Sequence, residues 1–159
     1  MKNWEIAVIV VFFTLFITLF SVTHPWQQKI GDSTTVDNVT VQFPVTPIVR
    51  DSLYKGYEIE TGWKFVILAV SVYNWGPENR TFFAGRMEDK DGIVYFAEAV
   101  EYSDIKSYTQ LSAGEGDFFH IAYKMPTNAV PKQVYYTISN FEAHKSSYGN
   151  VLLRKSIWG

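Results

Sequence analysis

Histidine is the side chain in this sequence best suited to hold a metal ion or to transfer a proton near neutral pH. The chain has three, His24, His120 and His144. None stands in an H-x-H or H-E-x-x-H spacing that would bring two ligands to one metal. His120 alternates with apolar residues and is expected to be a hydrogen-bonded interior or interface residue. His24, beside Trp26, is interpreted as an anchor at a membrane interface.

Acidic residues gather around one predicted turn, where Glu88, Asp89 and Asp91 lie within four positions. Calcium takes about six to eight oxygen ligands, so such groups serve as ligands only if they converge in space. Asp89 and Asp91 are therefore weak calcium candidates. The alternative interpretation is a solvated turn followed by an acidic loop.

Other catalytic patterns are missing from the sequence. There is no cysteine, which excludes disulfides, thiolate metal sites, iron–sulfur clusters and cysteine nucleophiles. No G-x-S-x-G elbow is present, and Gly114-Glu115-Gly116 lacks the spacing of a phosphate loop. We therefore expect no catalytic residues and no bound cofactor.

The charge pattern argues against nucleic-acid binding. The formal net charge is −2, with both signs interspersed along the chain, whereas nucleic-acid binding usually needs a sustained basic surface. Aromatic residues make up 17% of the chain, which is typical of a β-rich domain with well-filled faces.

The first 26 residues are predicted to form a transmembrane anchor. The segment from Ile6 to Val22 is uncharged, and Trp4 and Trp26 flank it at a separation of 22 positions. At about 1.5 Å per residue this is roughly 33 Å of helix, close to the hydrocarbon thickness of a bilayer. A cleaved signal peptide is the alternative, but no clear small-x-small cleavage site follows the apolar run.

The orientation rests on few charges. Lys2 precedes the predicted helix and Lys29 is the first basic residue after it, which weakly favours a cytoplasmic N-terminus. Sequons at Asn38 and Asn79 lean the same way, because glycosylation requires the large domain to lie outside. Sequons also occur by chance. We expect a single-pass protein of the cell membrane with an extracytoplasmic C-terminal domain.

Small and weakly polar residues recur on one side of the predicted helix. Ala7, Thr14 and Ser21 are seven positions apart, and Thr18 adds a step of four from Thr14. Such a face lets another transmembrane helix approach closely and hydrogen-bond. The alternative is that each hydroxyl bonds its own i−4 carbonyl and faces lipid.

The rest of the chain predicts a polar linker over 27–35 and one domain over 36–159. The stretch 64–74 is apolar on both faces and is expected to be the central strand, and Asp91-Gly92 marks a hairpin. No amphipathic helix is predicted after the anchor. Eight or nine short strands argue for an antiparallel β-sandwich. They are predicted at 36–43, 56–60, 64–74, 81–89, 93–99, 107–111, 116–125, 133–141 and 151–155.

The central strand ends in a turn of unusual composition, "NWGP" from Asn74 to Pro77. The Asn74 side chain is expected to bond its own local backbone, and Gly76-Pro77 redirects the chain. Trp75 is a candidate interface residue, because a large aromatic at a turn either folds back on the sandwich or faces a partner.

Residues 55–140 resemble a known family. The stretches "GWKFVILAVSVYNWG", "MEDKDGIVY" and "LSAGEGDFFHIAYKMPTNAVPKQVYYTI" are similar to the extracytoplasmic immunoglobulin-like domain of unknown function found in bacterial and archaeal lipoproteins, related in fold to the mycobacterial immunoprotective antigen. The resemblance implies an immunoglobulin-like β-sandwich and no agreed catalytic motif. This chain departs from the family because it has a predicted transmembrane helix in place of a lipobox cysteine.

These observations favour a non-catalytic accessory subunit that binds a protein partner in a membrane or envelope complex. One alternative is a subunit II-like component of a terminal quinol oxidase, necessarily copper-free because binuclear copper there needs paired cysteines. Another is an archaellum-stator-like protein that binds the surface layer. Capture of a small ligand within the sandwich lacks any convergent polar signature.

Overall fold

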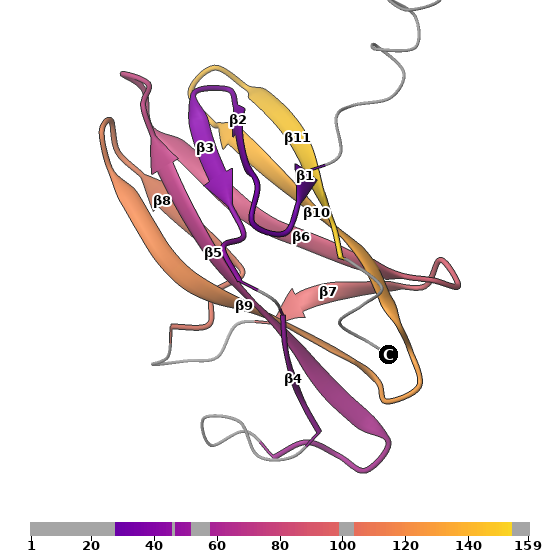
Figure 1. Ribbon diagram of the computed structural model, residues 1–159. Helices are drawn as coiled ribbons and strands as arrows, with labels where there is room; N and C mark the ends of the chain where they lie inside the picture. Colours follow the sequence, from indigo (N-terminus) through magenta and orange to yellow (C-terminus); the bar gives the residue numbers. More distant parts are fainter. Residues whose placement is uncertain (1–27, 46, 52–57, 99–103, 154–159) are drawn as a thin grey trace, which may run out of the picture.

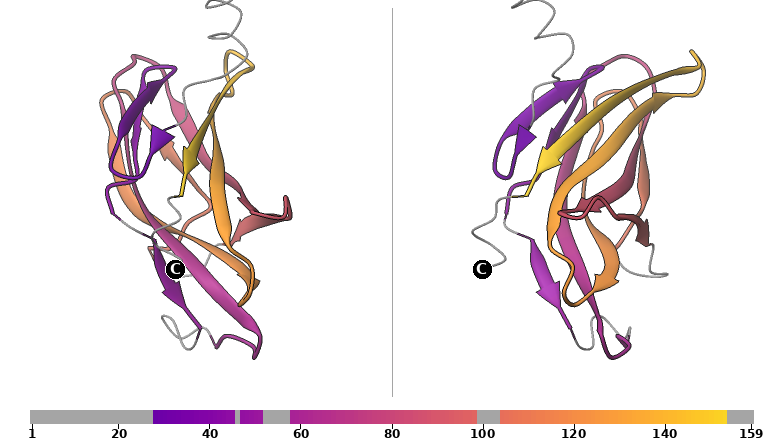
Figure 2. Two further views of the ribbon diagram at one scale, coloured as in Figure 1. Left: turned by 45° about the vertical axis from the view of Figure 1, so that its right-hand side comes forward. Right: turned by 90° about the vertical axis from the view of Figure 1, so that its right-hand side faces the viewer.

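The structure, a computed structural model, describes residues 28–45, 47–51, 58–98 and 104–153. These residues form an all-β domain of two packed antiparallel sheets (Figure 1), seen nearly edge-on in Figure 2. Across the described ranges, no helix is long and apolar enough to span a bilayer. The predicted anchor lies outside the described residues, together with Trp4, Trp26 and the helix face of Ala7, Thr14, Thr18 and Ser21.

The first sheet is built around β6 (Arg80–Asp89) and β10 (Pro131–Asn140), which pair antiparallel. On the far side of β10 lie β11 (Lys145–Leu152) and then β1 (Gln28–Lys29), which runs parallel to β11. The other edge of β6 is shared between β8 (Tyr108–Leu111) and β7 (Val94–Glu98).

The second sheet is built around β5 (Trp63–Asn74) and β9 (Gly116–Pro126), paired from Trp63↔Pro126 to Tyr73↔Gly116. On its other edge β5 pairs with β4 (Ile48–Arg50) and β3 (Val39–Gln42), and β2 (Ser33–Val36) pairs with β3. The end of β7 also pairs with β9, at Ala97↔Tyr123, and so joins the two sheets.

Alternating apolar residues from both sheets fill the main core. Val66, Leu68, Val70 and Val72 point inward from β5, as the sequence predicts. They meet an aromatic group in which Phe82 stacks on Tyr136 with ring centroids 5.6 Å apart. Burying each such side chain contributes about 1.5–3 kcal/mol, so this interlayer packing is the main source of stability.

The other face of β5 is also buried over its first half. Phe65 and Ile67 form a second small cluster with Ile105 and Ala122, and Ile48 and Ile59 pack against it. The prediction that 64–74 is a central strand with two apolar faces is therefore confirmed. The predicted hairpin is also confirmed, because Glu88 pairs with Val94 across the turn that contains Asp91-Gly92.

Three predictions of local structure are wrong. The stretch 27–35, predicted as a linker, contributes β1 and β2 to the sheets. Residues 58–60, predicted as part of a strand, instead lead into a turn in which the Trp63 amide donates to the Glu60 carbonyl. The last strand begins at Lys145 instead of Val151. Its first residues are polar because they lie at a sheet edge, so the apolar pattern that marks a strand is missing.

A buried glutamine explains why β1 belongs to the domain. The Gln28 side chain donates to the backbone carbonyls of Asp32 and Val41, at 2.9 and 2.8 Å, and accepts a hydrogen bond from the Tyr136 hydroxyl. Burial raises the pKa of Tyr136 to about 12, so this hydroxyl stays a donor at neutral pH. The chain is thus fixed to the sandwich from Gln28 onward.

Candidate interaction site at the loop end of the sandwich

Four connections meet at one end of the sandwich, which we call the loop end (Figure 1). They are the β2–β3 turn at 37–38, the β5–β6 loop at 75–79, the β8–β9 loop at 112–115 and the β10–β11 turn at 141–144. The Trp75 amide donates to the Asn38 carbonyl, and the Asn74 amide donates to the Glu115 carbonyl. These bonds tie the β5–β6 loop to its neighbours on either side.

Asn74 organises two of these loops from a fully buried position. Its Nδ2 donates to the carbonyls of Glu78, Leu111 and Ser112, at 2.8, 3.3 and 3.0 Å. Its Oδ1 accepts from the Gly76 amide at 3.0 Å. The predicted local bond is therefore present, but the same side chain also holds the β8–β9 loop, which the sequence does not reveal.

Arg80 connects the remaining loops through a buried charge. Its guanidinium is 6% exposed and lies 3.2 Å from an Asp37 carboxylate oxygen and 2.9 Å from one of Glu78. The same Glu78 oxygen also accepts from Asn140 on β10. The guanidinium is buried, whereas Asp37 and Glu78 are 28% and 53% exposed, so solvent screens both ion pairs. Loss of both carboxylates would nevertheless leave a buried charge without a partner. The loop end is therefore held in one arrangement.

Trp75 is held in place at the loop end and is also exposed. Its indole Nε1 donates to the Thr40 hydroxyl at 2.8 Å, and its ring lies 4.2 Å from that of Tyr73. Yet 68% of the residue is exposed. The indole thus folds back on β3, one of the two outcomes that the sequence leaves open, and still offers most of its surface to solvent. The interface role of Trp75 stays a prediction.

Both predicted sequons lie at the loop end, with Asn38 and Asn79 exposed. Asp37 and Asn38 have φ values of 47° and 63°, as a two-residue type I′ hairpin turn requires. The sequence carries this signal as Asp-Asn between two alternating runs. Glycosylation at either asparagine stays a prediction.

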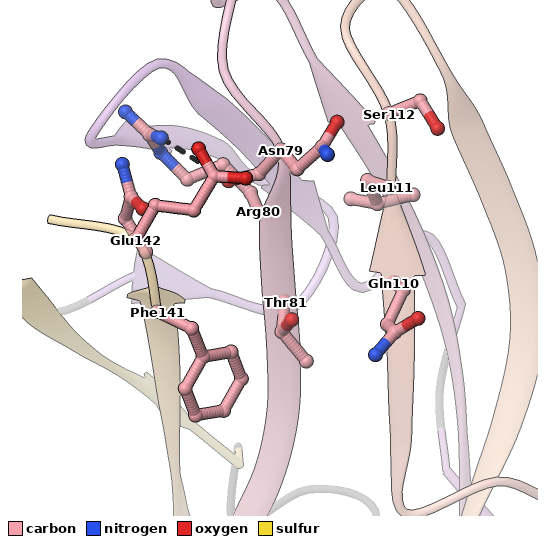
Figure 3. A pocket seen from close by; sticks show the side chains of 9 residues that line it. Asn79, Arg80, Thr81, Gln110, Leu111, Ser112, Phe141 and Glu142 are labelled. Carbon is pink, nitrogen blue, oxygen red and sulfur yellow. Dashed lines mark hydrogen bonds between the residues drawn. The ribbon is translucent and has the colours of Figure 1, made fainter. Parts of the chain in front are cut away.

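A hollow of about 190 Å³ opens beside the loop end, between the ends of β6, β8 and β10 (Figure 3). Thr81 and Gln110 pair across β6 and β8 on one side of it. Phe141, 61% exposed, stands on the other. The cation at its rim is Arg80, already paired with Glu78 and Asp37. The exposed Glu142 also lines the hollow, so the hollow adds an aromatic edge and a carboxylate to the loop end.

The weak calcium candidates do not converge. Asp89 is buried, and its Oδ1 accepts from the amides of Asp91 and Ile93 while its Oδ2 accepts from the Tyr95 hydroxyl. These bonds fix the hairpin turn and occupy both oxygens, while Asp91 is exposed. In the described part of the chain, no group of three or more His, Asp or Glu side chains comes together to hold a metal ion.

Two polar groups of β9, His120 and Asp117, bond to residues that precede β9 along the chain. The sequence predicts a hydrogen-bonded His120 but not these partners. His120 Nδ1 lies 2.6 Å from an Asp104 carboxylate oxygen, and the half-buried imidazole stacks edge-on against Phe118. Asp117 accepts from Lys106 at 2.8 Å and from Thr109 at 2.7 Å. The partners are 8 to 16 positions apart, so only the β8–β9 connection brings them together.

The Asp117 pair gives a pH-dependent prediction. Burial would raise the pKa of this carboxyl, but the hydrogen bonds from Lys106 and Thr109 outweigh it and hold the pKa below its ordinary value. The stabilisation is therefore present above the unfolded value of about 3.9 and is lost as the pH falls through the lower folded value.

Asp117→Asn is expected to lower the free energy of unfolding by about 1–2 kcal/mol at pH 7. The side chain is 24% exposed, so solvent screening favours the lower end. The difference from wild type should shrink at pH 3. Urea denaturation at both pH values measures it, with the exposed Glu142→Gln as control. A cost that is unchanged at pH 3 would contradict the charge-assisted pair.

Comparisons with known proteins bear on the fold of the chain. No family model matches the chain, and no curated protein matches it. Among solved structures, the yjhA protein of Bacillus subtilis is similar with a TM-score of 0.53 and 16% identity, covering 80% of this chain and 100% of that chain. The likeness shows a shared fold.

Two further structures are similar at lower scores. An uncharacterised β-sandwich protein of Clostridium difficile has a TM-score of 0.46 and 14% identity, covering 82% of this chain and 97% of that chain. The candidate lipoprotein ycdA of Bacillus subtilis has a TM-score of 0.48 and 13% identity, covering 79% and 40%. The chain is an all-β sandwich similar to proteins of unknown function.

Proposed function

We propose that this protein is a non-catalytic accessory subunit, anchored in the cell membrane, whose extracytoplasmic domain binds a protein partner through the loop end. The observation that carries the proposal is Trp75, an indole fixed at its Nε1 and yet 68% exposed. Tryptophan is among the residues most enriched at binding hot spots.

A fixed aromatic residue suits a binding role for a physical reason. Immobilising a flexible side chain on binding costs about 0.5–1.5 kcal/mol, and here the bond to Thr40 and the contact with Tyr73 already restrict the indole. Asn74 and Arg80 restrict the loops around it in the same way. A partner that covers Trp75 therefore gains its buried area at little ordering cost.

The anchor and its orientation belong to the proposal. Residues 6–22 have the length and apolar character of a membrane span, and the few flanking charges favour a cytoplasmic N-terminus. We propose that Ala7, Thr14, Thr18 and Ser21 pack against a partner helix and that Trp4 and Trp26 mark the two interfaces. The two-layer antiparallel sandwich supports the immunoglobulin-like type that the sequence resemblance implies.

The short tether also favours a partner in or next to the membrane. Only residues 23–27 separate the predicted span from Gln28, whose side chain is already locked into the sandwich. Five residues reach at most about 18 Å. The domain is therefore held near the bilayer, where it meets the extracytoplasmic parts of membrane proteins.

Replacing Trp75 separates binding from folding. Trp75→Ala in the full chain, purified from native membranes in mild detergent, is expected to reduce recovery of the partner at least tenfold, as truncation of a hot spot does. The melting temperature should fall by only a few degrees, because one exposed hydrogen bond and one ring contact are lost. Mass spectrometry of the purified complex identifies and quantifies the partner.

Tyr148→Ala is the matched control, because Tyr148 is a 76% exposed aromatic residue on β11, in the other sheet. It should leave partner recovery unchanged. A Trp75→Ala protein that unfolds would assign Trp75 to packing. A wild-type chain that purifies alone and monomeric would overturn the proposal.

A further inference from the structure

The outer face of the first sheet carries a trough that the loop-end site does not use. The trough measures about 300 Å³ and crosses β11, β10, β6 and β7. Its lining is mostly apolar, with Phe96 on β7 at one end and Tyr148 on β11 at the other. This size lies at the low end of about 300–1,000 Å³ for small-ligand pockets.

A β-bulge at Gly85 forms the floor. Gly85 has a φ of 55°, and the pairing of β6 with β10 shifts between Tyr135 and Thr137. A Cβ on Gly85 would lie 2.3 Å from the Tyr135 carbonyl oxygen, so the position requires glycine. With no side chain there, the sheet backbone lies open beneath the flanking residues.

Two rings rise at the ends of this floor. Phe96 is 74% and Tyr148 76% exposed, the two highest values among the large apolar residues of the described chain. Both stand on strands of one sheet, so their spacing is fixed by the sheet. Exposed aromatic faces on a rigid surface attract a flat apolar group, because the ring face carries partial negative charge and ligand C–H groups carry partial positive charge.

Arg86 supplies a cation without a carboxylate partner in the described part of the chain. Its guanidinium lies 4.8 Å from the centre of the Tyr135 ring, which holds it over the trough. The nearby Glu88 is already used, because one of its oxygens accepts from Lys132 and the other from the Tyr135 hydroxyl. A planar guanidinium that has no carboxylate partner is suited to a bidentate bond with a ligand carboxylate.

The floor also restricts what kind of ligand fits. Backbone groups of β6 and β10 on either side of the bulge are paired with each other in the sheet, so an extended peptide lying across them would leave its own amides without backbone partners, which is costly. A sugar ring presents C–H groups on its faces and hydroxyls at its edge. Thr137 and Tyr148 line the trough and carry hydroxyls that can donate to or accept from such groups.

We propose that this trough binds a short stretch of an acidic polysaccharide, with one sugar ring against Phe96, another against Tyr148 and a sugar carboxylate on Arg86. The site lies on a different surface from Trp75 and does not depend on the proposed protein partner. The ligand class is a uronic-acid-containing chain, chosen because the trough pairs exposed rings with one uncompensated cation.

The test uses the full chain in mild detergent with three soluble probes, polygalacturonate, alginate and hyaluronan. We expect at least one to bind at low salt, and isothermal titration measures the affinity. Arg86→Gln should weaken binding at least tenfold, and Phe96→Ala and Tyr148→Ala should do the same. Methyl-esterified polygalacturonate, which keeps the rings and loses the charge, serves as the matched ligand control for polygalacturonate.

Arg50→Gln and Phe118→Ala are the matched protein controls, because they remove an exposed arginine and an exposed aromatic residue elsewhere. Trp75→Ala should bind the probes as wild type does, which separates this site from the loop end. Absence of binding by all three probes, or equal binding by Arg86→Gln and wild type, overturns the proposal. Equal, Arg86-dependent binding of poly-L-glutamate would instead assign the trough to acidic peptides and also overturn it.

Discussion

Replacing Asn74 with alanine is expected to lower the free energy of unfolding by about 3 kcal/mol. The side chain is fully buried and makes four hydrogen bonds to backbone groups of two loops. Alanine leaves those groups without this partner, and each buried unsatisfied group costs about 1–3 kcal/mol. Because the loops lie near solvent, water can hydrogen-bond to some of these groups in the variant. The total loss of stability is therefore smaller than the sum of the separate costs.

Asn74→Asp gives a sharper form of the same test. Aspartate keeps the acceptor for the Gly76 amide but turns a second oxygen toward the carbonyls of Leu111 and Ser112, which accept from the wild-type amide. The ionised form is disfavoured there, so the pKa of the new carboxyl should be raised. The variant should therefore be least stable at neutral pH and recover stability as the pH falls through that raised value.

Chemical denaturation and partner recovery together decide the role of Asn74. Asn150→Ala, which removes one half-buried amide with a single side-chain bond of 3.5 Å, should cost under about 0.5 kcal/mol. If Asn74→Ala costs no more than this control, Asn74 does not hold the loop end together. If stability falls as expected and the remaining folded protein binds its partner weakly, the loops position Trp75.

Local patterns predict much of the sandwich because neighbouring residues decide them. The alternation of Val39, Val41 and Phe43 places one face of β3 in the core, and a turn with Asp91-Gly92 fixes a hairpin whatever lies around it. The central strand β5 is recognisable because both its faces are apolar over a length that only a covered strand tolerates.

Features that depend on distant partners were missed for the same physical reason. The strand β1 has no apolar signature, and it joins the sheet through its pairing with β11 and the hydrogen bonds that Gln28 makes with Val41 and Tyr136. The link from Asn74 to Leu111 spans 37 positions. The trough requires the pairing register of β6 with β10, which no local pattern specifies.

Gly85→Ala is the second substitution with a large expected effect. The position needs a left-handed φ of 55°, which costs a side chain about 1–2 kcal/mol, and its Cβ would lie 2.3 Å from the Tyr135 carbonyl oxygen. That atom belongs to the backbone, so relief requires β6 and β10 to separate. We expect the free energy of unfolding to fall by about 3 kcal/mol.

Gly114→Ala isolates the part of this cost that comes from the close approach. Gly114 has a φ of 72°, and no atom lies within 4 Å of its Cβ position. It should cost only the conformational term of about 1–2 kcal/mol. Because the bulge sets where Arg86 stands relative to Phe96 and Tyr148, Gly85→Ala should also weaken binding of the acidic polysaccharide beyond what its stability explains. Equal costs at the two glycines would show that the strands move apart freely, and the bulge could then not fix the geometry of the trough.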